Sequence, residues 1–466
     1  MKRERRAVWG WVLYDWANSA FATSVMAGFF PIFFKKYWSL GADVNTSTAL
    51  LGFANSTASL LIAFLAPILG AIADQGSSRK GFLVLFAYLG ALMTGSLFMV
   101  KEGAWTGAIL FYALGSIGFY GANVFYDSLL PVVASKRDID FVSGLGYGLG
   151  YLGGGLLFLV HVCMTVMPSK FGLPDAATAM RFAFLSVAVW WGGFTVFTVL
   201  WVREERPHRR ERTLGHAVGE GLRQLFRTFR NVRGSRRSVF IFLLAYWFYI
   251  DGVDTIIRMA VDYGLSLGFD SNDLIISLLI VQFIGFPASL IYGRLGQWWD
   301  VRKAIYLGIG CYLWITIWGV LITKKEEFFV LAVWIGLVQG GVQALSRSFY
   351  TRLIPERNWA QYFGFYNMIG KFAAILGPVM IGMVGLIVRG ILMPSAATPG
   401  QVEAVGRLAS RWGLASVSVL FLTGAALLYF VDEEKQGPVT GKTDQGNRRR
   451  HGTGKIRASK EDEYDA

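Results

Sequence analysis

The chain has 466 residues, of which 54% are hydrophobic and only 16% are charged. Soluble domains carry about 25% charged residues, so the composition excludes an ordinary soluble enzyme. The net charge is +14 and the mean hydropathy is +0.45. In a chain this apolar, orientation in a membrane explains an excess of Lys and Arg better than nucleic acid does. We therefore expect a lipid bilayer around the protein and no nucleic-acid partner.

Twelve apolar stretches are each long enough to cross the ~30 Å hydrocarbon core of a bilayer. In chain order they are residues 9–34, 49–73, 81–100, 104–134, 142–167, 179–202, 239–265, 273–297, 304–322, 328–351, 361–392 and 412–431. Asp15 and Asn18 interrupt the first stretch, which predicts an uncleaved helix rather than a signal peptide. The sequence therefore predicts an all-α integral membrane fold with twelve transmembrane helices.

Positive charge is unevenly divided between the two sides of these spans. If both termini are cytoplasmic, 31 of the 45 Lys and Arg residues lie on that side, 10 lie on the other side and four lie within the spans. This bias follows the positive-inside rule, and an even number of spans agrees with it. We therefore predict cytoplasmic N- and C-termini.

The longest polar interruption, residues 203–237, contains eleven Arg residues. Within it Leu214, Val218 and Leu222 recur at helical spacing, which predicts an amphipathic helix on the inner membrane surface; a solvated linker is the alternative. The expected domains are a six-helix bundle (1–202), this basic cytoplasmic loop (203–237), a second six-helix bundle (238–431) and a tail (432–466). The tail is polar throughout, so we expect it to be disordered.

Short motifs repeat in the same order in the two bundles. "GAIADQGSSRK" (70–80) and "GRLGQWWDVRK" (293–303) both begin with Gly and end with Arg-Lys, 223 residues apart. "YDWANS" (14–19) and "IDGVDT" (250–255) share an Asp followed three residues later by Asn or Asp. Transporters are often built from two such homologous halves. We therefore expect the two six-helix bundles to be pseudo-symmetric.

Every third predicted span, starting with the first, carries a stripe of polar side chains. The stripes are Asp15 and Asn18; Asn123 and Asp127; Asp251, Asp254 and Arg258; and Gln339, Gln343 and Arg347. Steps of three or four residues place the members of each stripe on one helix face. A charge facing lipid costs at least ~2.5–3.5 kcal/mol at the bilayer centre. The four striped helices are therefore expected to line one central cavity.

This arrangement resembles the Major Facilitator Superfamily, and four motifs are similar to one branch of it. The motifs are "YDWANSAF", "DGVDTIIRMA", "GLVQGGVQALSRS" and "FGFYNMIGKFAAILGP". They resemble the vacuole-effluxer-like transporters, which comprise the autophagy-related vacuolar amino-acid effluxers and their bacterial relatives, also called the Unknown Major Facilitator family. The resemblance covers nearly all of residues 8–431 and implies efflux of amino acids or similar small metabolites.

The acids of the stripes are candidates for proton coupling. Asp251, near mid-membrane, is the first candidate, and Asp15 matches it in the repeat. The alternative for Asp251 is a structural ion pair with Arg258 or Arg347. Asp254 and Arg258 stand four residues apart and are expected to pair with each other.

The remaining polar residues of the spans suit a polar ligand. Arg347 and Lys371 are candidates for holding a substrate carboxylate, or for neutralising the acids of the seventh span. Hydrogen bonds to a ligand, or between helices, are expected from Asn18, Asn123, Gln339 and Gln343.

Six charged residues lie at the predicted cytoplasmic ends of helices: Asp74, Arg79, Lys80, Asp300, Arg302 and Lys303. The resemblance implies that they form a gate, an ionic latch that holds the two halves together in the outward-open state. Anchoring by the positive-inside rule is the alternative, although anchoring requires no acid at Asp74.

The sequence shows no Walker motif and no recognisable nucleophile–base arrangement, so we expect neither an enzyme nor a cofactor or metal. The expected function is secondary active transport of a small polar solute, such as an amino acid, with the proton as coupling ion and efflux favoured over import. The alternatives are a proton-driven importer of another small metabolite, a lipid flippase and a membrane scaffold. We expect a monomer in the cytoplasmic membrane of a bacterium.

Overall fold

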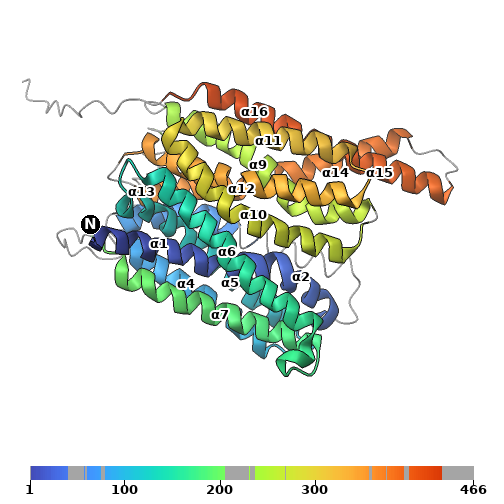
Figure 1. Ribbon diagram of the computed structural model, residues 1–466, viewed down its shortest axis with the longest axis horizontal. Helices are drawn as coiled ribbons and strands as arrows, with labels where there is room; N and C mark the ends of the chain where they lie inside the picture. The colour runs from blue at the N-terminus through green and yellow to red at the C-terminus, as the bar shows by residue number, and fades with distance from the viewer. Residues whose placement is uncertain are drawn as a thin grey trace, which may run out of the picture. The chain divides into compact units, whose positions relative to one another are not determined.

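The computed structural model describes residues 2–39, 57, 60–74, 79–204, 230, 237–267, 269–355, 359–373, 375–392 and 398–432 (Figure 1). The amphipathic helix predicted within residues 203–237 and the disordered tail predicted at 432–466 lie almost entirely outside these residues.

The first half of the chain begins with an unbroken helical run from Lys2 to Trp38. It consists of α1 (Lys2–Ala20), the π-helix η1 (Phe21–Phe29), the short α2 (Phe30–Phe33) and a second π-helix, η2 (Phe34–Trp38). The helix Leu60–Asp74 follows. The other elements of this half are α4 (Arg79–Ser96), η3 (Leu97–Met99), α5 (Trp105–Val133), α6 (Ile139–Val166), η4 (Pro168–Phe171) and α7 (Ala176–Trp201).

The second half contains eight α-helices among the described residues. They are α9 (Arg237–Ser266), α10 (Ser271–Trp298), α11 (Val301–Leu321), α12 (Lys325–Leu353), α13 (Trp359–Phe372), α14 (Leu376–Leu392), α15 (Pro399–Ser416) and α16 (Ser418–Tyr429). The predicted span 361–392 is interrupted after Phe372, which separates α13 from α14. The last predicted span, 412–431, begins much earlier, because Thr398 caps the start of α15 by accepting a hydrogen bond from the N–H of Gln401.

Ten of the described helical segments are long and apolar enough to cross a membrane, if α13 and α14 are taken as one segment and α15 and α16 as another. The helix Leu60–Asp74 is a shorter apolar one. The run from Lys2 to Trp38 covers the first predicted span in full. The protein is therefore an all-α integral membrane protein, as the composition predicts.

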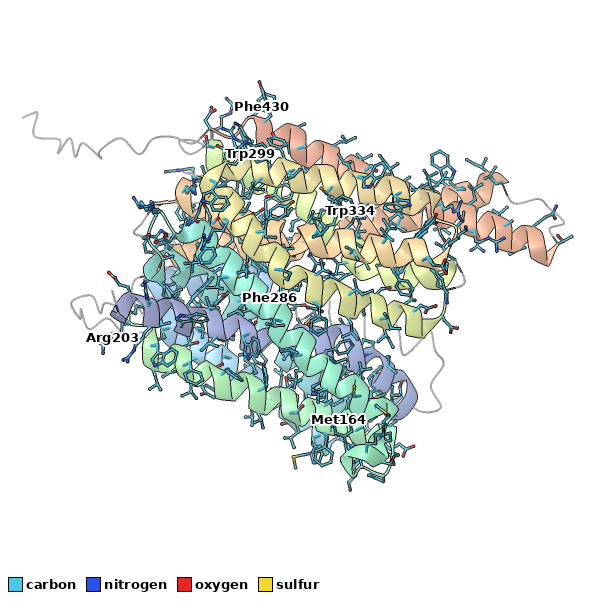
Figure 2. All side chains as sticks on the ribbon, viewed as in Figure 1. Met164, Arg203, Phe286, Trp299, Trp334 and Phe430 are labelled. Carbon is cyan, nitrogen blue, oxygen red and sulfur yellow. The ribbon has the colours of Figure 1, made fainter. Side chains whose placement is uncertain are left out.

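Each half has its own hydrophobic core. The core of the first half is rich in aromatic residues of η1, α2 and η2, and that of the second half gathers around α9, α11 and α12. Figures 1 and 2 show the N-terminus, Arg203, Trp299 and Phe430 toward one end of the helices and Met164 toward the other. We call the first of these the termini end.

The two halves meet mainly where α6 packs against α10 and α12, and where α5 packs against α13. Glycines of α6 allow the backbones to approach closely. A Cβ atom on Gly144 would lie 2.5 Å from the carbonyl oxygen of Ser289, and one on Gly148 would lie 3.0 Å from that of Phe286. Small residues at such crossings are the usual means of close packing between membrane helices.

Candidate functional site

An ion pair joins the halves at the centre of the candidate site. Arg347 of α12 lies 3.0 Å from Asp127 of α5, and both side chains are buried. The same guanidinium donates to the hydroxyl and to the carbonyl oxygen of Ser143 on α6, each at 3.0 Å. The other carboxylate oxygen of Asp127 accepts a hydrogen bond from Asn367 of α13 at 3.0 Å. Because both members of the pair make further hydrogen bonds, their two charges can be held away from water.

Three aromatic rings surround the guanidinium of Arg347. Its central carbon lies 4.9 Å from the ring centroid of Trp11, 5.3 Å from that of Tyr126 and 4.5 Å from that of Tyr147. All three rings belong to the first half, and cation–π attraction at this range favours a desolvated cation. The arginine of one half is therefore seated in a socket made by the other.

Asp15 of α1 lies next to this socket and is partly exposed. One carboxylate oxygen accepts a hydrogen bond from the hydroxyl of Tyr126 at 3.1 Å, and the other faces the hydroxyl of Ser19 at 3.5 Å. Tyr126 thus contacts both Asp15 and the cation of Arg347. A change in the charge of Asp15 can therefore affect the position of Arg347 through Tyr126 alone.

Asp251 of α9 has different partners, although it matches Asp15 in the repeat. Its side chain is 0% exposed. Its carboxylate accepts hydrogen bonds from the N–H groups of Leu376 and Gly377, at 3.0 and 2.8 Å, and from the hydroxyl of Thr255 at 3.2 Å. Leu376 and Gly377 open α14, so Asp251 satisfies donors that the interruption of the helix leaves free and opposes the positive end of its dipole.

The two arginines suggested as ion-pair partners of Asp251 bind other acids. Arg258 lies 3.9 Å from Asp254, the partner that the four-residue spacing predicts. Arg347 binds Asp127. Gly377 explains how Asp251 reaches α14, because a Cβ atom at this position would overlap Thr255 and lie 2.9 Å from the Asp251 carboxylate. The structural role open to Asp251 is therefore that of a helix cap and not that of an ion pair.

A second charged group lies beside the central pair. The Lys371 ammonium of α13 sits 3.4 Å from the ring centroid of Tyr120 on α5. Lys371 is close enough to interact electrostatically with Arg258, Asp254 and Asp127. Asp254 and Arg258 are both partly accessible, with side-chain exposures of 22% and 52%. This group offers a cation and an anion to a polar solute.

The predicted amides also lie in this region. Asn18 donates to the side-chain oxygen of Asn123 at 2.6 Å, which links α1 to α5. Gln339 and Gln343 of α12 are partly buried, and Gln339 lies beside Tyr151 of α6.

Several residues of the site were not identified from the sequence: Ser143, Asn367 and the tyrosines at 120, 126 and 147. Asn367 stands four residues before Lys371, a spacing that could have revealed it. The tyrosines carried no such signal, because aromatic residues are frequent throughout the spans.

Asp74 joins the halves at the termini end. Its carboxylate pairs with Arg79 at 2.8 Å and accepts hydrogen bonds from the N–H groups of Ala360 and Gln361, at 3.1 and 2.8 Å. These two N–H groups belong to the first turn of α13, and the guanidinium of Arg79 lies over the ring of Trp359 in the same turn. Asp74 therefore caps a helix of the opposite half.

The other predicted gate residues bind within their own half. Lys80 donates to the carbonyl oxygens of Val199 and Val202. Asp300 accepts from the N–H of Lys303 and so caps the start of α11, while Arg302 donates to the carbonyl oxygen of Val431.

Different residues join the halves near the second gate motif. Gln297, at the position that matches Asp74, donates to the carbonyl oxygen of Arg137 at 3.0 Å. Arg352 forms an ion pair with Asp140, which is buried in the first turn of α6. With the Asp74 contact, these bonds hold the halves together at the termini end.

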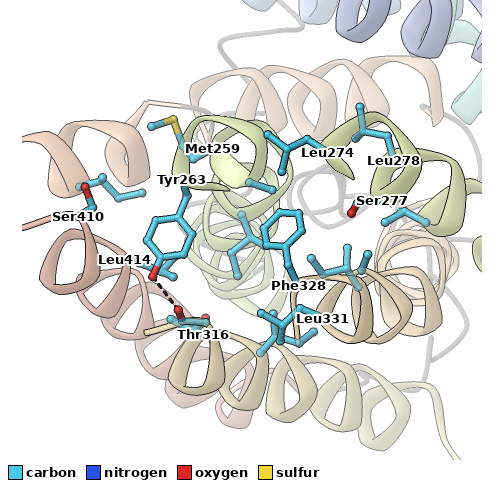
Figure 3. A pocket seen from close by; sticks show the side chains of 18 residues that line it. Met259, Tyr263, Leu274, Ser277, Leu278, Thr316, Phe328, Leu331, Ser410 and Leu414 are labelled. Atoms are coloured by element: carbon cyan, nitrogen blue, oxygen red, sulfur yellow. Dashed lines mark hydrogen bonds between the residues drawn. The ribbon is translucent and has the colours of Figure 1, made fainter. Parts of the chain in front are cut away.

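The second half also contains an apolar cavity that is lined in part by α9 (Figure 3). Its lining includes Met259, Tyr263, Leu274, Phe328, Ala332 and Leu414. The hydroxyl of Tyr263 is bonded to the carbonyl oxygen of Gly319 at 2.6 Å. The cavity is lined by a different face of α9 from the one that carries Asp251, Asp254 and Arg258. Among the described residues there is no cluster of three or more His, Cys, Asp or Glu side chains that could hold a metal ion.

Comparison with known proteins gives one family. A family model described as vacuole effluxer Atg22 like matches residues 3–387. An uncharacterized MFS-type transporter of Bacillus subtilis (strain 168), YxiO, is 35% identical and aligns with 94% of this chain and 98% of its own length. Autophagy-related protein 22-1 of Aspergillus terreus is 23% identical, over 85% of this chain and 76% of its own length.

Solved structures agree on the fold. The human organic anion transporter MFSD10 superposes with a TM-score of 0.64 at 15% identity, covering 91% of this chain and 99% of that one. The proton:xylose symporter XylE superposes with a TM-score of 0.63 at 11% identity, covering 92% and 95%. Identities this low speak for the fold alone, which is that of the Major Facilitator Superfamily.

Proposed function

Because the chain belongs to the vacuole effluxer Atg22-like family of Major Facilitator transporters, we propose that it exports an amino acid or a related small polar metabolite, with protons as the coupling ion. The two halves rock about the central site, which opens alternately to each side of the membrane. The protein works as a monomer in the cytoplasmic membrane of a bacterium, with both termini in the cytoplasm.

The observation that carries this proposal is that Arg347, of the second half, binds side chains of the first half. Its ion pair with Asp127 and its aromatic socket cross the interface that must open during alternating access. A proton on Asp127 or Asp15 removes a negative charge that holds the guanidinium, so protonation weakens the contact between the halves. A substrate carboxylate can take the place of the lost charge, because Arg binds carboxylates in bidentate geometry.

The neighbouring charges suit the two ends of an amino acid. Lys371 and Arg258 can receive its carboxylate, and Asp254 can receive its ammonium group. Asp15 is the better of the two coupling candidates, because it is partly exposed and bonded to hydroxyl groups. Asp251 is fully buried and bonded to backbone N–H groups, so we assign it to holding α14.

The test is transport by the purified protein in liposomes. Substrate-induced currents and internal pH are recorded for an amino-acid panel, with and without a pH gradient, for wild type, Asp15→Asn, Asp251→Asn and a control, Asp432→Asn, at an exposed position beyond α16. We expect one class of amino acid to move protons in wild type and in the control, and no proton movement in Asp15→Asn. Proton-coupled transport by Asp15→Asn would contradict the assignment, and silence of well-folded wild type across the panel would contradict the substrate class.

Direction is decided in the same vesicles. If an inward proton gradient drives amino acid out against its own gradient, the protein is an exporter. If the same gradient drives accumulation, it is an importer, and the proposed direction is wrong.

A further inference from the structure

Lys303 is the predicted gate residue whose side chain lines a groove on the outer surface of the second half. The groove follows α11 and is bordered by α12, with a lining that includes Trp299, Lys303, Leu307, Gly310, Cys311 and Trp314. Lys303 and Gly310 are exposed, and Trp299, Leu307 and Trp314 are each about half exposed. Trp334, from α12, also lines the groove.

The length of the groove matches one leaflet of a bilayer. Lys303 and Trp314 stand eleven residues apart on α11, which corresponds to about 16 Å along a helix axis. Half of the hydrocarbon core is about 15 Å thick. Trp299 and Lys303 lie at the termini end, where α10 ends and α11 begins. The groove therefore runs from the membrane surface to about mid-membrane.

The chemistry changes along the groove as it does along a phospholipid. The surface end offers the ammonium of Lys303 beside an indole ring, a combination typical of the headgroup region. The deeper part is apolar, and at Gly310 a Cβ atom would find no other atom within 4 Å, so the floor is open there. Of the charges next to Lys303, Asp300 is bonded to the start of α11 and Arg302 to the carbonyl oxygen of Val431.

We propose that this groove is a binding site for one anionic phospholipid, with its phosphate on Lys303 and one acyl chain lying across Gly310 and Cys311 toward Trp314. Basic pockets between membrane helices bind anionic headgroups in this way. The lipid would bridge α11 and α12, and α12 is the helix that carries Arg347.

The first half provides a matched control surface. A groove between α6 and α7 is lined by Leu157, Phe182, Val189, Trp190, Gly193 and Phe197, and no Lys or Arg is among its lining residues. A Cβ atom on Gly193 would also find no other atom within 4 Å. This groove offers room for an acyl chain but no cation for a headgroup, so it should not discriminate between anionic and neutral lipids.

The proposal is tested by native mass spectrometry of the delipidated full-length protein, titrated with phosphatidylglycerol or phosphatidylcholine. The variants are Lys303→Gln, Gly310→Leu and the control Gly193→Leu. Both leucines fill open space on a helix and favour helix formation, so the variants should fold. Wild type and Gly193→Leu should retain one phosphatidylglycerol in preference to phosphatidylcholine. Lys303→Gln should lose about five- to tenfold in affinity for phosphatidylglycerol only, the effect of one Lys near an anionic headgroup.

Gly310→Leu should lose the tightly bound lipid of either kind. The proposal is overturned if Gly310→Leu binds phosphatidylglycerol as wild type does, or if Lys303→Gln keeps the full preference for it.

Cys311 supplies a second readout inside the groove. In a Cys163→Ser background Cys311 is the single thiol, since the chain has two cysteines. Added phosphatidylglycerol should slow alkylation of Cys311 by N-ethylmaleimide several-fold, and Lys303→Gln should shift this protection to higher lipid concentration. Alkylation at the same rate with and without lipid would also overturn the proposal.

Discussion

The first helix of each half carries an aspartate at the same place in the repeat, and the two aspartates have different surroundings. Asp15 is partly exposed and bonded to the hydroxyls of Tyr126 and Ser19. Asp251 is fully buried and bonded to the backbone at the start of α14. A carboxylate that is held by side-chain hydroxyls can gain a proton without opening the fold, whereas one that caps a helix is needed as an anion. Equivalent positions in a repeat therefore need not share a role.

The same two helices also differ beyond the aspartates. In the first half, η1, α2 and η2 are packed by aromatic rings: Phe30 stacks on Tyr112 with centroids 3.9 Å apart, and Phe33 meets Trp38 at 4.7 Å. In the second half, the matching part of α9 borders the apolar cavity. Filled interiors resist deformation, whereas a cavity leaves its lining short of contacts. Away from the termini end, we therefore expect the second half to be more easily deformed than the first.

The largest expected effect comes from removing one aromatic ring in each half. Phe30→Ala should lower the free energy of unfolding in detergent by about 3–5 kcal/mol, because it empties a filled core. Phe328→Ala enlarges a space that already exists, so its loss should be about half as large. Urea or thermal unfolding of both variants measures the difference. Equal losses would mean that the two halves are equally well packed.

Removing the charge of each aspartate sharpens the contrast between them. Asp251→Asn leaves an N–H of α14 without its partner, which should cost about 1–3 kcal/mol of stability, and should raise amide hydrogen exchange at residues 376 and 377. Asp15→Asn should leave the unfolding midpoint nearly unchanged and should abolish proton movement. If Asp15→Asn were the less stable of the two, the roles assigned to the aspartates would have to be exchanged.

Adding volume should affect the halves in opposite directions. Ala183→Leu inserts carbon atoms into the filled first core and should destabilise the protein by about 1–3 kcal/mol. Ala332→Leu projects into the cavity and should be neutral or stabilising by up to about 1 kcal/mol. Matching midpoints for the two variants would contradict the proposed difference in packing.

The smallest expected effect concerns the N-terminal caps of α7 and α15. Asp175 caps α7, and the N–H of Thr178 holds the pKa of its carboxyl below the usual value; α15 is capped by the uncharged Thr398. The stabilisation by Asp175 should be complete above its unfolded pKa of about 3.9 and should be lost as the pH falls through the lower folded pKa. Thr398 should contribute equally at all pH values.

The measurement is amide exchange at residues 176–178 and 400–401, compared between pH 6 and pH 3 after correction for intrinsic rates. Asp175→Asn should remove the pH dependence at the first cap while preserving the cap itself. An equal pH dependence at both caps would show that the carboxylate is not its source.

The sequence predicted the helices well because each carries a long apolar run. Polar residues within the helices could be singled out as site candidates because charge is rare in such runs. The sequence did not predict the interruption between α13 and α14, since the residues at the break, "FAAIL" (372–376), are all apolar. The partners of Asp251 and Asp74 were also missed, because both acids bind backbone N–H groups, which carry no sequence signature. Of the residues predicted to form a gate, Asp74 contacts the opposite half, whereas Lys80, Asp300 and Arg302 bind within their own half; the gating role stays a prediction.

The contact of Asp74 with Ala360 and Gln361 has a consequence for how this protein can evolve. An acid that binds backbone N–H groups makes no demand on the side chains it faces, so residues 360 and 361 can drift without loosening the contact. Pairs of positions that change together reveal contacts only when both side chains take part. Across homologues, covariation should therefore be weak between position 74 and positions 360 and 361 and strong between positions 127 and 347, although both pairs of sites join the same two halves.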